Sequence, residues 1–209
     1  AVQPREALLA LARLAAEHDL YLVSDEIYDR LTYTGAHTCL GTLPGARERT
    51  VLLGGFSKAH AMTGWRVGWI CAPQPVAELC VRVHQYTMLC APHVSQLAAV
   101  EALESADPDV AEMVADYDRR RRVFVKGLRE IGLDCPEPGG AFYAFPSIRS
   151  SGLDSTTFAE RLLHEQGVAV VPGDVFGPSG EGHVRCSYAT ALPLLEEALG
   201  RMDRFLRSL

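Results

Sequence analysis

Apolar residues in the first part of the chain occur at helical spacing or in short continuous runs. Between Pro4 and His18 they recur every three to four residues, which predicts an amphipathic helix. The runs 20–23 and 51–53 are continuous and predict buried strands, and a third strand is expected over 67–72 before prolines stop it. Continuous apolarity favours a mainly parallel sheet covered on both faces.

The second part of the chain begins with a helical pattern over residues 76–105. Asp107 and Pro108 then open a long helix, whose apolar stripe ends near Gly132. Beyond it we expect strands over 141–145, 168–171 and 183–188, a helix over 156–166 and a final helix from Pro193. The sequence therefore predicts an α/β region over 1–106, a connecting helix over 107–132 and a small α+β lobe over 133–209.

Composition and charge exclude several classes of protein. The formal net charge of −6 and the pI near 5.6 argue against a nucleic-acid surface, which needs clustered excess Lys and Arg. Four consecutive arginines, 119–122, point around most of the circumference of the long helix, so we expect them to be solvated or salt-bridged. The longest apolar runs are far shorter than the ~20 residues of a membrane span, so no membrane segment is expected.

Cysteine and histidine usage indicates where the protein works and what it does not bind. The six cysteines form no C-x-x-C pair, which favours reduced thiols and a cytoplasmic protein. The seven histidines form no H-E-x-x-H or similar pair, so no metal site is predicted. The glycines between 173 and 182 precede no G-K-[ST], and we interpret them as a flexible connection between strands.

Reactive side chains follow two of the predicted strands. Asp25 comes directly after the first, and Ser57 and Lys58 come shortly after the second. Because ligands collect at the carboxyl ends of parallel strands, we expect these groups to share one edge of the sheet. Gly54, Gly55 and Gly64 would let the backbone pass close to a ligand there.

These residue types match the needs of a pyridoxal 5'-phosphate cofactor. Lys58 would supply the amine that binds it, and Asp25 would stabilise the positive charge on the ring nitrogen. Ser57 and Arg66 would hold the phosphate, the guanidinium as a bidentate clamp. His60 lies near the lysine, and we favour a cleft-lining or structural role for it over acid–base chemistry.

Two motifs carry a resemblance to a known family. Residues 24–28 read S-D-E-I-Y, and residues 57–68 fit the pattern S-K-x-x-x-x-x-G-x-R-x-G. Asp25 precedes Lys58 by 33 positions, and Lys58 precedes Arg66 by 8. In these motifs and spacings the chain resembles the class I/II aminotransferases of the fold-type I pyridoxal-phosphate enzymes. Residues 138–143, 171–173 and 184–189 also look like the small-domain signatures of that family.

The resemblance implies a fold and a set of residue roles. Residues 1–106 would be the C-terminal portion of the large cofactor-binding domain with its mainly parallel sheet, and 133–209 the small α+β domain. Lys58 would be the Schiff-base lysine, Asp25 the partner of the ring nitrogen and Tyr28 the donor to the ring hydroxyl. Ser57 and Arg66 would bind phosphate, and Arg185 would clamp the substrate α-carboxylate from the face of its strand opposite Val184 and Cys186. The family commonly forms homodimers.

The resemblance covers about half of a family member. The family's N-P-x-G turn would lie immediately before Ala1, so we expect a C-terminal fragment that retains cofactor weakly on its own. The expected activity is amino-group transfer between an α-amino acid and a 2-keto acid. A carbon–sulfur β-lyase or a decarboxylating relative would use the same residues, and a non-catalytic effector-binding module of a regulator is the alternative from another class.

Overall fold

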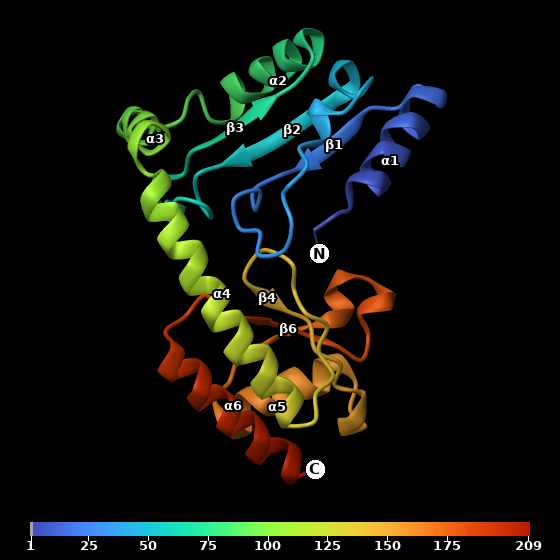
Figure 1. The fold of residues 1–209 in the computed structure, drawn as a ribbon, viewed down its shortest axis with the longest axis vertical. Coiled ribbons are helices and arrows are strands. Elements are labelled where there is room, and N and C mark those ends of the chain that lie inside the picture. The colour runs from blue at the N-terminus through green and yellow to red at the C-terminus, as the bar shows by residue number, and fades with distance from the viewer. Residues whose placement is uncertain (1) are drawn as a thin grey trace. The chain divides into compact units, whose positions relative to one another are not determined.

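A three-stranded sheet organises the first part of the chain (Figure 1). The computed structural model describes residues 2–209, which divide into two units, one that ends at Val114 and a second from Ala115 to Leu209. The first unit contains β1 (Leu22–Asp25), β2 (Thr50–Gly55) and β3 (Gly68–Cys71), in the order β1-β2-β3. The three-part division predicted from the sequence, with limits at 106 and 132, stays a prediction.

The pairing of the strands differs in part from the expected parallel sheet. β1 and β2 are parallel, as predicted, with Asp25 opposite Leu53. β3 runs antiparallel to β2, with Trp69 opposite Gly54, so one of the two strand pairs departs from the mainly parallel arrangement expected from the apolar runs. A parallel pair needs a crossover of about a dozen residues or more, usually a helix. Residues 56–67 instead form a turn and the 3₁₀ helix η3 (Thr63–Trp65), so the chain folds directly back.

The predicted first helix is present as α1 (Arg5–Glu17), and it packs against the sheet. Ala12 of α1 is buried together with Leu40, Leu43 and Ala46, which belong to or flank the short 3₁₀ helices η1 (Leu40–Thr42) and η2 (Arg47–Arg49). Leu22 of β1 and Leu52 of β2 lie against the same cluster. The helical spacing of apolar residues thus marks the face of α1 that meets the sheet.

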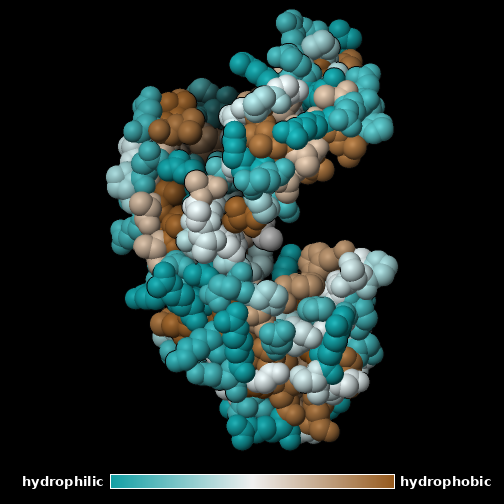
Figure 2. All heavy atoms as spheres, turned by 45° about the vertical axis from the view of Figure 1, so that its right-hand side comes forward, coloured by the Kyte–Doolittle hydropathy of each residue, from teal (hydrophilic) through white to brown (hydrophobic). Residues whose placement is uncertain are grey.

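Two helices form where a helical pattern was expected over 76–105. These are α2 (Gln74–Thr87) and α3 (His93–Ser105), and Pro92 precedes the second. α2 has no buried residue and all four residues of β3 are exposed, so the described chain does not cover the sheet on both faces as expected. Tyr86 of α2 is 93% exposed. Figure 2 shows hydrophobic residues (brown) on the surface of the first unit.

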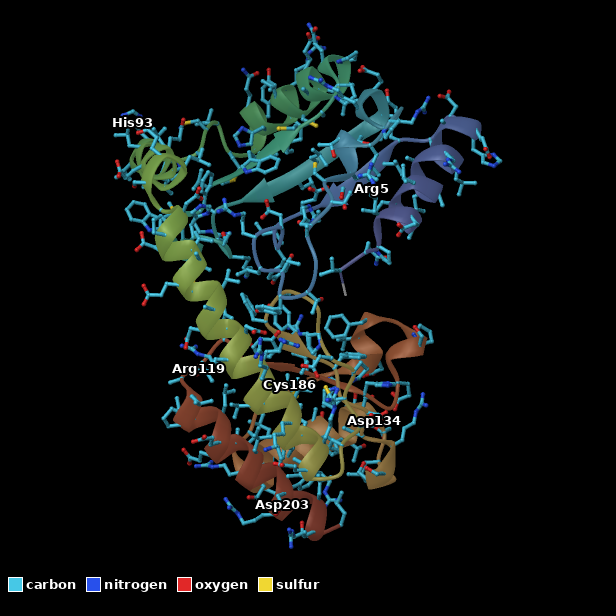
Figure 3. The ribbon with its side chains drawn as sticks, viewed as in Figure 1. Arg5, His93, Arg119, Asp134, Cys186 and Asp203 are labelled. Carbon is cyan, nitrogen blue, oxygen red and sulfur yellow. The ribbon has the colours of Figure 1, made fainter. Side chains whose placement is uncertain are left out.

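The predicted long helix is α4 (Asp107–Glu130). Its four consecutive arginines all form ion pairs, as expected, and Arg119 projects from α4 in Figure 3. Arg121 is buried, and its guanidinium lies 2.6 Å from Asp118 and 2.5 Å from Glu137. Its neighbours are more exposed, so one arginine of the run is a core residue.

The second unit packs helices on a small antiparallel sheet. Its strands are β4 (Tyr143–Ala144), β6 (Val184–Ser187) and β5 (Val171–Pro172), in the order β4-β6-β5. Its helices include η4 (Arg149–Ser151), α5 (Ser155–Gln166) and α6 (Leu192–Arg207). Phe158 of α5 and Phe205 of α6 meet edge to face at 5.3 Å in the core. Gly167, at φ 66°, ends α5 as predicted.

The glycine-rich connection is more ordered than the sequence suggested. It forms η5 (Gly173–Phe176) and η6 (Pro178–Gly180), whose backbones touch: a Cβ on Gly173 would lie 2.1 Å from the carbonyl oxygen of Gly180. The buried Ser155 hydroxyl accepts hydrogen bonds from the amides of Gly182 (2.9 Å) and His183 (3.3 Å). Gly173 and Gly180 thus permit close packing of two turns, a role that the interpretation as a flexible connection did not include.

Candidate active site

Lys58 lies on a tight turn that follows β2. The carbonyl oxygen of Phe56 accepts hydrogen bonds from the amides of His60 (3.3 Å) and Met62 (3.2 Å), and the carbonyl of Lys58 accepts one from Ala61 (3.3 Å). Phe56 and Met62 are buried in a cluster with residues of α3. The half-buried Lys58 therefore lies on a turn whose ends, Phe56 and Met62, are held in the core.

Asp25 emerges at the same edge of the sheet. It is the last residue of β1, and the parallel register sets it opposite Leu53, five positions before Lys58. The amide of Glu26 donates to the carbonyl of Leu53 (2.8 Å), and Asp25 itself accepts from the amide of Ile27 (3.2 Å). Tyr28 follows in the turn after β1 and is half-buried. The structure thus brings both motifs to the carboxyl end of the parallel pair, where the sequence predicted them.

Ser57 and Arg66 line one cavity of about 240 Å³. The other lining residues are Ile27, Gly54, Gly55, Val67 and Gly68. A guanidinium and a hydroxyl around a small, glycine-walled cavity form a donor set suited to a phosphate group. The residues present therefore fit the phosphate of the expected cofactor at this place.

Arg66 has an unusual backbone conformation. Its φ of 53° and ψ of 48° lie in the left-handed region, which non-glycine residues seldom adopt. The guanidinium donates to the carbonyl of Thr63 at 2.7 Å. Conformations of this kind cost ~1–3 kcal/mol and persist where the surrounding structure imposes them, often at functional sites. The turn thus fixes both ends of the Arg66 side chain.

Two of the glycines that line this cavity, Gly54 and Gly68, also permit close packing within the sheet. A Cβ on Gly54 would lie 2.2 Å from Cζ2 of Trp69, and one on Gly68 would lie 2.9 Å from the carbonyl oxygen of Gly54. A Cβ on Gly64 would meet no atom within 4 Å. Gly54 makes room for an aromatic ring across the antiparallel pair, and Gly68 permits close approach of β3 to β2.

Glu26 is a structural residue of the site that the sequence reasoning did not single out. Its carboxylate accepts from Ser24 Oγ (3.1 Å) and from the amide of Leu40 (3.0 Å), and it pairs with His37 Nε2 (2.9 Å). Burial raises the pKa of Glu26, but the hydrogen bonds from His37, Leu40, Cys39 and Ser24 outweigh it and hold the pKa below 4.5. In the sequence, this role could have been inferred from the acidic residue that directly follows Asp25 in the S-D-E motif.

His60 lies two residues after the lysine and packs against Phe56, with ring centroids 5.2 Å apart. Burial, followed by the charge of Arg30, lowers the pKa of His60 from 6.5. The ring is therefore held largely neutral at pH 7, in keeping with the packing role expected from the sequence.

Arg185 belongs to the second unit. Val184 and Cys186 are buried and Arg185 is half-buried, so the arginine faces away from the core of its unit, as predicted; Figure 3 marks Cys186 on β6. Its guanidinium carbon lies 4.6 Å from the ring centroid of Tyr143 and 5.1 Å from that of Phe176. Over residues 115–209, as far as they are described, no carboxylate pairs with Arg185.

Between residues 2 and 209 no group of three or more His, Cys, Asp or Glu side chains is placed to hold a metal ion. In the same range, no helix has the length and apolarity needed to cross a membrane.

Comparison with known proteins gives a consistent set of relatives. A family model described as aminotransferase class I and II matches residues 1–202. The Bacillus subtilis protein YugH is 54% identical over 205 residues, which cover 98% of this chain and 53% of that protein. An aspartate aminotransferase of Pyrococcus abyssi is 46% identical over 209 residues, covering 99% of this chain and 54% of that protein.

A solved structure shows the same fold. The aromatic aminotransferase from Pyrococcus horikoshii superposes with a TM-score of 0.96 at 46% identity, covering 100% of this chain and 57% of that one. This similarity confirms the predicted α/β class with a C-terminal small domain. The chain spans about half the length of the relatives it matches.

Proposed function

Because this chain belongs to the family of class I and II aminotransferases, we propose that it carries the cofactor lysine of a pyridoxal 5'-phosphate-dependent aminotransferase. The enzyme moves an amino group between an α-amino acid and a 2-keto acid. Since the chain spans about half the length of its relatives, the activity is assigned to a longer protein that contains it, here called the complete enzyme.

One observation carries this proposal: Lys58 directly follows Ser57, which shares a cavity with Arg66 at the carboxyl end of the sheet. Ser57 and Arg66 would hold the cofactor phosphate, Tyr28 would donate to the ring hydroxyl, and Lys58 would bind the cofactor covalently. When bound, the cofactor supplies an electron sink that stabilises negative charge at the substrate Cα.

The chain's own residues supply positioning and proton transfer. Once the substrate amine has replaced it on the cofactor, the free Lys58 amine would take and hold the proton of the substrate Cα, and its anchored turn limits the positions that it can reach. Asp25 fixes the ring nitrogen in its charged form, so replacing Asp25 impairs chemistry more than binding. Arg185 binds the substrate α-carboxylate through its in-plane N–H groups.

Assembly and location complete the proposal. A homodimer is the expected state of the complete enzyme, and exposed apolar side chains on α2 and α3, such as Tyr86 and Leu97, support burial against further protein. The cytoplasm is the expected location, because free cysteines such as the buried Cys135 and Cys186 suit a reducing compartment.

A half-reaction tests the activity. The complete enzyme, loaded with cofactor, is incubated with an amino acid alone. Amino transfer predicts one equivalent of 2-keto acid per cofactor and a stoichiometric change in the cofactor's absorbance, after which the reaction stops. Continued release of ammonia and keto acid beyond one equivalent would instead indicate a lyase. The absence of any spectral change across a panel of amino acids would favour a non-catalytic binding module.

A further inference from the structure

Two aromatic rings lie against the guanidinium of Arg185, and no sequence motif assigned them a role. The rings of Tyr143 and Phe176 are 4.6 Å and 5.1 Å from its central carbon, inside the ~6 Å range of cation–π contacts. We propose that Tyr143 and Phe176 are positioning residues that hold Arg185 ready for a substrate carboxylate. This inference rests on the proposed role of Arg185.

The sheet of the second unit puts Tyr143 in place. Tyr143 of β4 is opposite Ser187 of β6, and cross-strand partners share a face of a sheet. Arg185 lies two residues before Ser187 and so points to that same face. Tyr143 is therefore a diagonal neighbour of the arginine, within reach of an aromatic side chain.

The backbone that leads to Tyr143 is fixed by several hydrogen bonds. The buried Arg121 donates to the carbonyl of Pro138 (3.2 Å), and the hydroxyl of Tyr188 donates to the carbonyl of Ala141 (3.1 Å). The amide of Tyr188 donates to the carbonyl of Phe142 (3.0 Å). Ala141 has a φ of 59°, a left-handed conformation that the surrounding bonds must impose. The hydrogen-bonded backbone of segment 138–143 thus fixes the position of the Tyr143 ring.

Phe176 is held by the glycine-rich connection. It ends η5, whose first residue, Gly173, touches the backbone of Gly180 without room for a side chain. The ring of Phe145 meets Phe176 at 6.1 Å, edge to face, and stacks on His183 at 5.3 Å. Phe176 is 52% exposed, but the side of its ring that faces the protein packs against Phe145.

The two rings contact the guanidinium carbon of Arg185 at cation–π distance. A ring contacts the face of the guanidinium, whereas the N–H groups point outward in its plane. A carboxylate binds this edge through two parallel hydrogen bonds. A free arginine side chain loses rotamer freedom on binding, and the rings remove that freedom beforehand. The expected benefit is tighter binding of carboxylate substrates, with little effect on the chemical step.

The test uses the complete enzyme with Phe176→Leu, Tyr143→Leu and Phe176→Tyr variants, and with Val175→Ala as an exposed neighbouring control. We expect each leucine variant to raise the KM for amino acid about three- to tenfold with kcat nearly unchanged, the scale of a cation–π contact. Phe176→Tyr and Val175→Ala keep the wild-type KM. Half-reaction rates with a primary amine that lacks a carboxylate stay the same in all variants.

An Arg185→Lys variant separates failure of this inference from failure of the proposed function. If Arg185→Lys raises the KM strongly while the leucine variants leave it unchanged, the arginine binds carboxylate without help from the rings and the inference is overturned. If Arg185→Lys leaves the KM unchanged as well, the proposed role of Arg185 is wrong. A rise in KM for the carboxylate-free amine would also contradict the inference, since it indicates general damage to the site.

Discussion

Arg66 donates a hydrogen bond from its guanidinium to the carbonyl oxygen of Thr63, at 2.7 Å, across a single turn. With its backbone in the left-handed region at φ 53°, the side chain is turned back along η3 and borders the cavity that Ser57 also lines. Apart from Ile27, the cavity proposed for the phosphate is therefore lined by residues within ten positions of Lys58.

Replacing Arg66 by lysine should weaken cofactor binding. Lysine keeps the charge but loses the planar fork that binds phosphate through two hydrogen bonds, each worth ~1.5–3 kcal/mol when charged. We expect the Kd for pyridoxal 5'-phosphate to rise about tenfold or more in the complete enzyme, measured by absorbance titration. Arg13→Lys, on the exposed face of α1, is the control and should leave the Kd unchanged. Equal Kd values for wild type and Arg66→Lys would contradict the assignment of this cavity.

Glu26→Gln should destabilise the protein in a pH-dependent manner. The carboxylate holds four donors, and its pKa is lowered below 4.5 in the folded state. Its stabilising effect is thus fully present above pH 4.5 and is lost as the pH falls through the folded-state value. Urea unfolding at pH 7 should show a loss of about 1–3 kcal/mol in the variant. The difference from wild type should shrink below pH 4.5, whereas a difference that grows on acidification would contradict this role.

Gly54 and Gly64 should respond differently to alanine, although the sequence suggests one role for both. The added methyl at Gly54 would collide with Trp69, so Gly54→Ala should lower the free energy of unfolding by about 1–3 kcal/mol and shift the tryptophan fluorescence. Gly64→Ala meets open space and should change stability by less than about 0.5 kcal/mol. In a Trp69→Ala background, Gly54→Ala should no longer lower the free energy of unfolding. If it still does, the collision with Trp69 is not the cause of the destabilisation.

Arg121 and Arg122 offer a matched pair on α4, since both contact Asp118. The side chain of Arg121 is 6% exposed and that of Arg122 is 70% exposed. Removing one partner of a buried ion pair costs ~3–5 kcal/mol, whereas exposed pairs contribute ~0–1 kcal/mol. Arg121→Ala should therefore unfold at clearly lower urea concentration than Arg122→Ala. Similar midpoints for the two variants would show that burial does not distinguish them.

Much of this fold could be predicted from local patterns. The spacing of apolar residues located α1, α4, α5 and α6, because a helix must bury one stripe of its surface. The positions of Asp25 and Lys58 just after two predicted strands also placed them at one edge of the sheet, since parallel strands end together.

Features that depend on contacts between residues far apart in the sequence could not be predicted. β3 is antiparallel to β2 because the connection from Gly55 to Gly68 is short. The apolar run of β3 could not predict this, because such a run has the same pattern in a parallel and in an antiparallel strand. Glu26 gains its role from His37 and Leu40 in a later loop. The glycines at 173 and 180 looked flexible because their contact joins two turns that the sequence separates.

Covalent trapping of the cofactor tests the central claim most directly. The chain contains two lysines, Lys58 and Lys126, and Lys126 is 76% exposed on α4, where it lies 3.6 Å from Glu130. The complete enzyme is loaded with pyridoxal 5'-phosphate, reduced with borohydride and digested for mass spectrometry. We predict the reduced cofactor on the peptide that contains Lys58, its loss in Lys58→Arg and its retention in Lys126→Arg. Cofactor fixed on any other residue, or its absence from Lys58 in the loaded enzyme, would contradict the proposed function.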